Sequence, residues 1–426
     1  MSPASAAPAI RHPRWVLLAI CALSLMSTVG MALPYPILAP IFVGGPVDDF
    51  THFAGLDPRL LMGLALAANP LGILIGNLFI GPLSDRHGRR RVLAVTITAT
   101  LLSYGLTAFA LGQRWYLLFV LARFITGLTE GNVAVARALL ADMHEQIDRT
   151  QAFAWLNACL YMGWLLGPLV GGLTLPLGES VPFLLAGLAM LPCLLVLTLW
   201  VPDWRPASAA GSAPQPGFSG FWRQLREQQV LGLLRADPVL AALFALQLMY
   251  CLGVNALYEF APLWMLENMG LGSAGIAWVT AAQCAAMTTA SVVAGRLPAS
   301  RRPLRRAALL ALCAALGLSS LVLLPGPLGL AAIVGLGLPL ALYNAVLPAW
   351  MSERFAGHGQ GRVMGLLSTV FCLSNVLMAL IGGGLALLST RWIMGLGGVC
   401  CVAASLLLLR LARREAARPE PVQDTM

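Results

Sequence analysis

Residues 81–91 read GPLSDRHGRRR, a charged turn between two long apolar stretches. A helix that crosses a bilayer needs about 20 apolar residues, and both flanking stretches are long enough. The chain contains twelve such stretches: 15–41, 59–81, 92–112, 115–141, 151–175, 181–200, 239–266, 274–295, 304–324, 328–350, 363–388 and 392–411. Nothing in the hydrocarbon satisfies a free backbone group, so each span must be helical. The sequence therefore predicts an all-α membrane protein with twelve transmembrane helices.

The composition excludes several other classes of protein. Of the 426 residues, 58% are hydrophobic and only 11% are charged, against about 25% charged residues in a soluble domain. A soluble enzyme, a disordered protein and a disulfide scaffold are thereby excluded. The nine cysteines lie in apolar stretches without C-x-x-C spacing, and the five histidines lie in loops or tails. We therefore expect no disulfide framework, no metal site and no histidine proton relay.

The basic residues indicate the orientation in the membrane. All 27 are arginines, and the net charge is +9, for which the anionic inner leaflet is a better partner than nucleic acid. With the N-terminus inside, the outer loops hold Arg59, Arg114 and Arg391, Arg123 lies within a span, and the other 23 arginines are on the inner side. The positive-inside rule then predicts cytoplasmic N- and C-termini in a bacterial plasma (inner) membrane. The first stretch is too long for a signal peptide.

The chain divides near its middle. Residues 201–238 begin with a linker rich in Pro, Gly, Ala and Ser and continue as a short amphipathic segment. We expect an N-terminal six-helix bundle in residues 1–200, a cytoplasmic linker in 201–238, and a C-terminal six-helix bundle with a cytoplasmic tail in 239–426. A faint repeat of the 81–91 turn follows the eighth stretch, and such repeats place a substrate site near the midplane between the halves.

The turn at 81–91 resembles the signature loop of the major facilitator superfamily, G-x-L-x-D-R-x-G-R-R. The resemblance implies two six-helix bundles related by a pseudo-two-fold axis. It also implies a gating loop that latches the inward side shut, in which Asp85 faces the start of the eleventh span and Arg89 pairs with an acid at the inner end of the fourth. The residues assigned to this loop and its partner are Gly81, Asp85, Arg86, Gly88, Arg89, Arg90 and Asp142.

The fourth span contains ARFITGLTEGN, residues 122–132, in which Arg123 and Gly127 match the family pattern for this span. A charge inside the membrane is costly and by default indicates function. Glu130 follows Arg123 by two helical turns on the same face, too far for direct pairing. We expect Glu130 and Arg123 to carry proton coupling. The alternative is that Glu130 only neutralises Arg123 or Arg137.

The fifth span contains GWLLGPLVGG, residues 163–172, which resembles the antiporter motif of the same superfamily. The matching residues are Gly163, Gly167, Pro168, Gly171 and Gly172. The resemblance implies export rather than uptake. The alternative is a packing seam of small residues without functional meaning.

The first span contains GMALPYPILAP, residues 30–40, and resembles the proline-rich first span of the twelve-span drug/proton antiporters. Relatives of the tetracycline-exporter type carry an Asp just before this stretch, where this chain has Ser27 and Thr28. This departure argues against tetracycline as the substrate and favours Glu130 as the coupling acid.

Polar residues inside spans usually face the interior of a bundle. We assign eight of them to the substrate cavity: Tyr35, Asn69, Asn132, Asn255, Tyr258, Glu259, Tyr343 and Asn344. For Glu259, a role at the outer rim or gate competes with a role in proton coupling.

Together these features predict a secondary transporter that exports a small amphipathic molecule in exchange for protons by alternating access. It is not an enzyme, and it uses no ATP or other cofactor, because no nucleotide-binding or catalytic motif is found. Its expected partners are the substrate, protons and the lipid bilayer, with no nucleic acid, and it is expected to be a monomer. The alternatives are a dedicated siderophore or metabolite exporter, an uptake symporter, and a receptor that transports nothing.

Overall fold

The computed structural model describes residues 13–130, 135, 139, 149–201, 238–296, 302–324, 326–355 and 360–416. Helices make up most of this part of the chain, and it contains no strand. Eleven helices within it are long and apolar enough to cross a membrane, and Tyr116–Thr129 is a shorter apolar helix in the predicted fourth span. The predicted all-helical membrane fold is confirmed.

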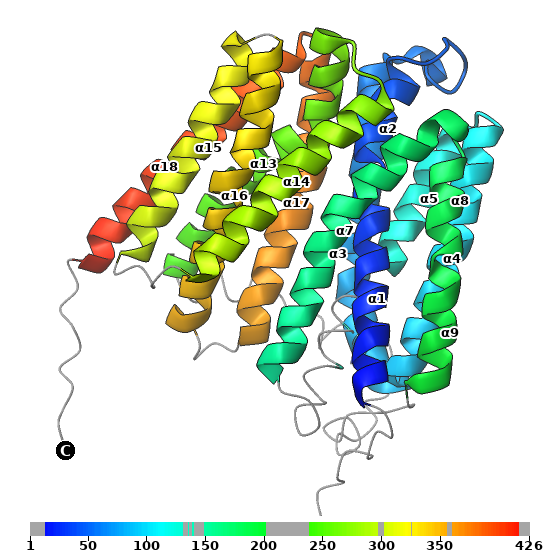
Figure 1. Ribbon diagram of the computed structural model, residues 1–426, viewed down its shortest axis with the longest axis horizontal. Coiled ribbons are helices and arrows are strands. Elements are labelled where there is room, and N and C mark those ends of the chain that lie inside the picture. Colours follow the sequence, from blue (N-terminus) through cyan, green and yellow to red (C-terminus); the bar gives the residue numbers. More distant parts are fainter. Residues whose placement is uncertain are drawn as a thin grey trace, which may run out of the picture. The chain divides into compact units, whose positions relative to one another are not determined.

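Most helix bounds lie within about six residues of the predicted stretches, but α5 ends at Thr129, whereas the predicted fourth stretch continues to residue 141 (Figure 1). The first half contains α1 (Pro13–Ala32), α2 (Tyr35–Phe42), α3 (Pro58–His87), α4 (Arg89–Gly112), α5 (Tyr116–Thr129), α7 (Arg149–Thr174), α8 (Val181–Leu188) and α9 (Met190–Trp200). The second half contains α13 (Pro238–Met269), α14 (Ser273–Arg296), α15 (Pro303–Leu323), α16 (Pro327–Arg354), α17 (Gln360–Ala386) and α18 (Thr390–Ala416). Short 3₁₀ turns occur at Phe53–Gly55 and Leu175–Leu177.

The first predicted span consists of two helices, α1 and α2. The chain turns at Leu33 and Pro34 between them. Proline has no N–H to donate to the preceding turn and disfavours helical geometry in the residue before it, so α1 ends here.

The non-helical part of the turn at 81–91 is shorter than its sequence suggests. The helix α3 continues to His87 and α4 begins at Arg89, so only Gly88 separates them. Its φ is 92°, in a region that side-chain-bearing residues rarely adopt. The glycine at this motif position is therefore required by the backbone.

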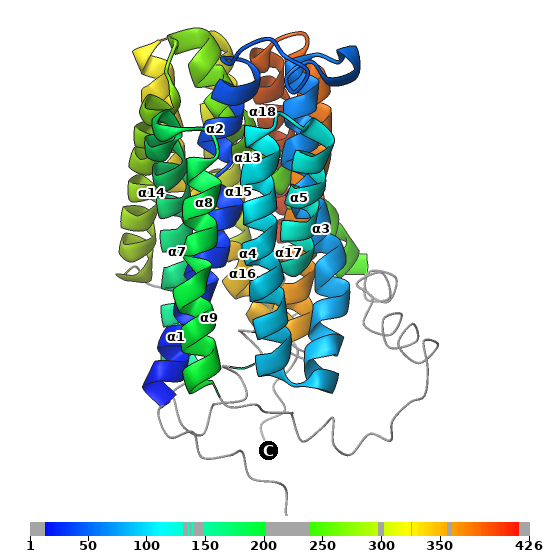
Figure 2. The ribbon, with the colours of Figure 1, turned by 90° about the vertical axis from the view of Figure 1, so that its right-hand side faces the viewer.

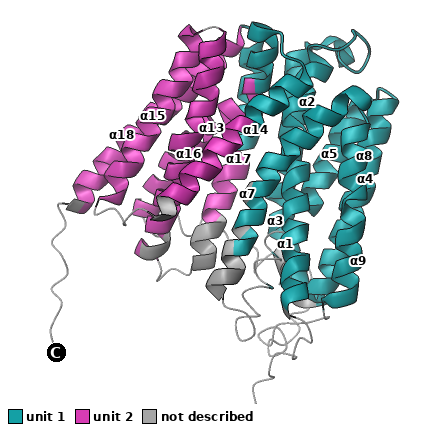
Figure 3. Cartoon of the chain, viewed as in Figure 1, with its two compact units in different colours: residues 1–229, 262–281, 375–388 teal, residues 230–261, 282–374, 389–426 magenta. Residues whose placement is uncertain are grey.

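The described chain forms two compact units (Figure 3). Unit 1 contains residues 1–229, 262–281 and 375–388, and unit 2 contains 230–261, 282–374 and 389–426. Unit 1 thus includes one end each of α13, α14 and α17. The predicted boundaries of the two sequence halves stay a prediction, and most of the predicted linker lies outside the described residues.

Within unit 1, α5 packs against α3 and α4, and α1 packs against α7 (Figures 1 and 2). Glycine allows the closest of these approaches. A Cβ at Gly72 of α3 would lie 2.7 Å from the backbone nitrogen of Leu128 on α5. Such backbone contacts are the usual way in which membrane helices pack, since burial of apolar surface does not drive their association. In unit 2, α15 packs against α16 and α18.

Candidate functional site

The carboxylate of Glu130 is the centre of a buried polar cluster in unit 1. Glu130 follows the last residue of α5 and is 5% exposed. Its Oε2 accepts a hydrogen bond from Nδ2 of Asn69 on α3 at 2.9 Å, and its Oε1 accepts one from the hydroxyl of Tyr104 on α4 at 2.7 Å. Two donors from two other helices therefore hold the carboxylate in place, which offsets part of the cost of its burial.

Arg123 lies two turns before Glu130 on α5 and is 3% exposed. Its charge acts on both Glu130 and Tyr104, yet no ion pair within 4.0 Å joins Arg123 to Glu130, as expected from their spacing. Among the described residues its Nε and Nη1 atoms have no hydrogen-bond partner. The guanidinium carbon lies 5.9 Å from the ring centroid of Phe183, a cation–π distance. Arg123 thus has donors left for a ligand.

The helix α1 covers this cluster at Gly30. A Cβ at Gly30 would overlap the hydroxyl of Tyr104, lie 2.6 Å from its Cζ and lie 3.2 Å from Oε1 of Glu130. The carboxylate of Glu130 therefore lies against α1 one turn beyond Ser27. Proton coupling by the fourth span stays a prediction.

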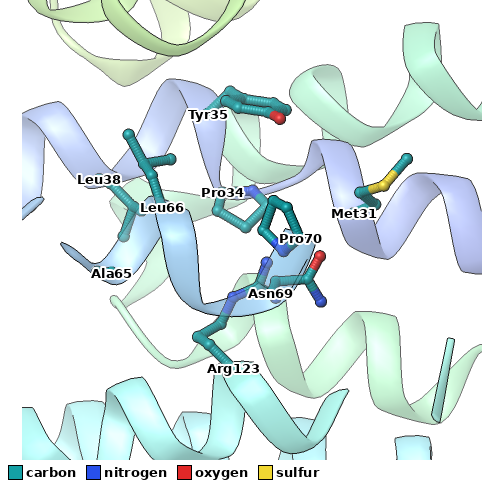
Figure 4. Close-up of a pocket in the computed structure, with 9 residues that line it drawn as sticks. All are labelled: Met31, Pro34, Tyr35, Leu38, Ala65, Leu66, Asn69, Pro70 and Arg123. Atoms are coloured by element: carbon teal, nitrogen blue, oxygen red, sulfur yellow. The ribbon is translucent and has the colours of Figure 1, made fainter. Parts of the chain in front are cut away.

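Asn69 and Arg123 also line a small pocket in unit 1 (Figure 4). Its other lining residues are Met31, Pro34, Tyr35, Leu38, Ala65, Leu66 and Pro70. The cavity volume is about 10 Å³, close to the minimum that one water molecule needs. The structure thus brings the predicted cavity residues Tyr35 and Asn69 together with Arg123, in a state that leaves no room for a substrate.

Tyr35 connects this pocket to two further side chains. Its hydroxyl donates to Oδ1 of Asn375 on α17 at 3.2 Å, within unit 1. Its ring stacks on Trp164 of α7, with centroids 6.0 Å apart. Asn375 was not among the predicted cavity residues.

The glycines of the 163–172 motif pack on α1 and α14. Three of them recur at four-residue spacing on the face of α7 toward α1. A Cβ would lie 2.6 Å from Cβ of Thr28 at Gly163, 2.7 Å from the carbonyl oxygen of Val29 at Gly167, and 2.5 Å from that of Leu33 at Gly171. At Gly172 a Cβ would lie 2.5 Å from the carbonyl oxygen of Ser273 on α14, also within unit 1. Pro168 lies within α7, which runs through it without a break.

The predicted gating loop is described only in part. The side chains of Asp85 and Arg86 and all of Asp142 lie outside the described residues. Gly81 is helical, Gly88 separates the two helices, and Arg89 is buried. Arg90 donates to the carbonyl oxygen of Thr198 on α9. The expected pair of Arg89 and Asp142 stays a prediction.

The predicted cavity residues of the second half lie in unit 2. Nδ2 of Asn255 donates to the hydroxyl of Ser374 at 2.8 Å. The hydroxyl of Tyr343 donates to Oε1 of Gln247 at 3.1 Å, and its ring stacks on Tyr250 with centroids 3.5 Å apart. Tyr343 is therefore buried within unit 2, and its role in a substrate cavity stays a prediction.

Glu259, also in unit 2, is 3% exposed, and its Oε2 has no hydrogen-bond partner among the described residues. Tyr258 and Asn344 are half-buried, and Asn132 lies outside the described residues. Glu259 is thus a second buried acid, but one without the donors that surround Glu130.

Two of the three arginines predicted to lie in outer loops, Arg59 and Arg114, pair with acids. Arg59, at the start of α3, contacts Glu267 of α13 within unit 1, with Nη2 and Oε1 2.9 Å apart. Arg114 contacts Glu179 at 2.9 Å and Asp48 at 3.3 Å. Ion pairs therefore link these loops to neighbouring segments within unit 1.

The sequence profile of the Major Facilitator Superfamily matches this chain over residues 15–338 and, in a second overlapping match, over 243–425. The chain belongs to the Major Facilitator Superfamily. Members of this superfamily are integral membrane transporters rather than enzymes.

Sequence relatives of this superfamily member include antibiotic resistance proteins. The tetracycline resistance protein of class B from Escherichia coli is 31% identical over 181 residues, which are 42% of each chain. The quinolone resistance protein NorA of Staphylococcus aureus is 25% identical over 47% of this chain and 51% of its own length. The chain thus spans about half, or less, of the length of these relatives.

Solved structures of the superfamily share the fold. The D-xylose–proton symporter has a TM-score of 0.74 at 17% identity and covers 93% of this chain and 97% of its own. The human organic anion transporter MFSD10 has a TM-score of 0.66 at 21% identity and covers 93% and 99%. These similarities support the twelve-helix superfamily fold.

Sequence reasoning about this superfamily member missed Tyr104. A tyrosine within an apolar span needs a hydrogen-bond partner for its hydroxyl, and this need could have identified Tyr104 as a candidate site residue. The sequence contains no sign that the partner is Glu130, because this depends on how α4 and α5 pack.

Proposed function

We propose that this chain exports a small amphipathic molecule from the bacterial cytoplasm in exchange for protons. Transport proceeds by alternating access in the inner membrane, with cytoplasmic termini and a monomeric protein. Efflux-type relatives and the glycine-rich fifth span support the direction of transport.

One observation carries the proton coupling. Glu130 is buried, is bound by Asn69 and Tyr104, and shares Asn69 with the pocket that Arg123 lines. A buried acid without an ion-pair partner within 4.0 Å in the described chain can gain and lose a proton without breaking a salt bridge. Glu130 is titratable and is hydrogen-bonded to Asn69, which lines the pocket. This arrangement is suited to link proton binding to substrate binding.

The test is proton flux in everted membrane vesicles with an acid interior. A pH dye reports proton loss on addition of lipophilic cations, antibiotics, iron-free siderophores or organic anions. A response to several unlike compounds supports multidrug exchange, and a response to one class supports a dedicated exporter. Silence to every compound contradicts proton-coupled export of these classes.

Variants then locate the coupling acid. Glu130→Gln is expected to abolish substrate-driven proton loss, and Asp49→Asn, which changes an exposed outer acid, is expected to retain it. Glu259→Gln tests which of the two buried acids, Glu130 or Glu259, carries proton coupling. If only this variant loses exchange, the coupling acid is Glu259 and the assignment of Glu130 is wrong.

A second candidate function is proton-coupled uptake of an organic anion. It is favoured by the unpartnered Nε and Nη1 atoms of Arg123 in the pocket, since a guanidinium edge matches a carboxylate. An anion there is held best when Glu130 is protonated, so anion and proton would travel together. In right-side-out vesicles, proton entry that depends on an added organic anion supports this candidate.

A further inference from the structure

We propose that the side-chain amide of Asn69 rotates when Glu130 gains a proton, and so changes the hydrogen bonds that the pocket offers a substrate. The inference rests on the proposed proton coupling and deepens it. It assigns Asn69 as the residue that links proton binding to substrate binding, and it names the chemical class of the substrate's head group.

In the structure, the amide of Asn69 is oriented as an ionised Glu130 requires. An ionised carboxylate only accepts hydrogen bonds, so the Nδ2 atom of Asn69 faces Glu130, at 2.9 Å from Oε2. Its Oδ1 is buried and has no partner among the described residues, and the whole side chain is 1% exposed. Since Nδ2 is held by Glu130, Oδ1 is the amide atom left for a ligand in the pocket that Asn69 lines with Arg123 (Figure 4).

Protonation reverses this arrangement. When Oε2 of Glu130 carries the proton it becomes a donor, and it then meets the N–H donor of Asn69. A half-turn of the amide removes the conflict, because Oδ1 then accepts from the O–H of Glu130. Tyr104 continues to donate to Oε1, and no other proton moves. Nδ2 is now the amide atom left for the pocket.

Few charged or titratable groups act on this pair. Among the described residues they are Arg123, on the same helix as Glu130, and Tyr104 on α4. The helices α1 and α3 present Gly30 and Asn69, neither of which titrates. The rotation therefore follows the protonation of one group, Glu130.

The two states bind different head groups. With Glu130 ionised, the pocket offers an acceptor, Oδ1 of Asn69, beside the donors Nε and Nη1 of Arg123. A head group with an O–H or N–H donor next to an acceptor oxygen, such as a hydroxy-ketone, satisfies both. With Glu130 protonated, Asn69 offers its Nδ2 donor in place of the Oδ1 acceptor, so the donor of the substrate loses its partner on Asn69. An unpaired buried donor is costly, and the substrate therefore leaves when the proton binds, as exchange requires.

The rotation itself is tested by infrared difference spectra of the purified full-length protein between alkaline and acid pH. The carboxyl band of protonated Glu130 is identified by its loss in Glu130→Gln. A side-chain amide band should change on acidification and vanish in Asn69→Leu, and the carboxyl band should shift in that variant. Asn77→Leu, two turns along the same helix, should leave both bands unchanged. A carboxyl band that appears without any Asn69-dependent change overturns the proposal.

The substrate class is tested by equilibrium binding of tritiated benzoin, an aromatic hydroxy-ketone, and of its methyl ether, which lacks the donor. In nanodiscs at alkaline pH, benzoin should bind about fivefold tighter than the ether, as expected for one net hydrogen bond. The ratio of the two affinities should fall to about one in Asn69→Leu, which lacks the acceptor. It should also fall to about one in Glu130→Gln, because the glutamine amide N–H can donate to Oδ1 of Asn69 and so take this acceptor from the ligand. In Asn77→Leu the ratio should stay near five. Equal affinities in the unchanged protein, or binding of neither probe, overturn the assigned class.

These experiments do not depend on transport. An amide band that responds to pH in a protein without vesicle exchange contradicts the proposed function and retains the switch. Exchange without the band retains the function and removes the switch.

Discussion

The hydroxyl of Tyr104 lies 2.7 Å from Oε1 of Glu130 and in the space that a side chain at residue 30 would fill. This one contact joins three helices, α4, α1 and the end of α5. A change in the protonation of Glu130 therefore acts directly on the contact between the first span and the rest of unit 1.

Tyr104→Phe tests the hydrogen bond while keeping the ring. The buried carboxylate loses one of its two donors, which is expected to lower stability by about 1.5–3 kcal/mol when Glu130 is ionised. Substrate-driven proton flux should slow as well. The measurements are unfolding in detergent at alkaline and acid pH and flux in vesicles.

The matched control is Tyr116→Phe, because that buried hydroxyl donates to the backbone carbonyl of Leu61 at 2.9 Å and not to an acid. Its cost should not depend on the pH. If both variants lose the same stability at both pH values, Tyr104 is only a packing residue.

Gly30→Ala tests the contact from the other side. The added Cβ overlaps the hydroxyl of Tyr104, so α1 must shift, at an expected cost of about 1–3 kcal/mol. The double variant with Tyr104→Phe removes the overlapping oxygen but leaves Cζ at 2.6 Å. We expect the two costs to be clearly non-additive, with partial rescue, in a double-mutant cycle of melting temperatures. Simple additivity would contradict the contact.

A third prediction concerns the seam between α3 and α17 within unit 1. A Cβ at Gly63 would lie 2.5 Å from the carbonyl oxygen of Ala379, whereas nothing lies within 4 Å of one at Gly384. Alanine favours a helix over glycine by about 1 kcal/mol. Gly384→Ala should therefore be neutral or stabilising, and Gly63→Ala should be destabilising by about 1–3 kcal/mol. Thermal unfolding of both variants measures the two changes in stability. An equal change in both would mean that the seam is not closely packed at Gly63.

The fourth prediction concerns pH and the outer loop. Burial raises the pKa of Asp48, but hydrogen bonds from the backbone of Thr51 and Phe50 and the charge of Arg114 outweigh burial and lower the pKa below its usual value. The ionised form is thus favoured by the folded loop. Its contribution is complete above about pH 4, the usual pKa of an aspartate, and is lost as the pH falls through the lowered value.

Asp48→Asn keeps an acceptor for the two backbone N–H groups and removes the charge. We expect it to lower loop stability at pH 7 by up to about 1 kcal/mol and to remove the acid-dependent loss. Hydrogen exchange of the Phe50 and Thr51 amides, corrected for intrinsic rates, measures both effects. An acid-dependent loss that persists in the variant would assign it to another group.

The helices and the buried charges were predictable from the sequence. Spans are marked by length and hydropathy, and a charge such as Glu130 stands out in an apolar stretch. Which face of a span turns inward was not predictable, because lipid and protein interior are both apolar. On α5, Phe119 is fully buried and Leu121 is 51% exposed, and the sequence treats them alike.

The polar contacts between helices could not be predicted from the sequence for a related reason. Tyr104 and Asn375 gain their roles from neighbours on other helices, and no spacing rule within one span reveals such neighbours. Of the predicted cavity residues, Tyr35 and Asn69 line the pocket with Arg123, while Asn132 lies outside the described residues. Those of the second half belong to unit 2.

The glycines of α7 that touch α1 recur every four residues, about 6 Å along the helix axis. The backbone of α1 repeats at nearly the same interval, so a slide of one turn would present this seam with almost the same surface. The seam therefore selects which helices touch without fixing their register. A contact that does distinguish one register of α1 from the next is that of Gly30 with the hydroxyl of Tyr104, beside the acid proposed to carry the proton.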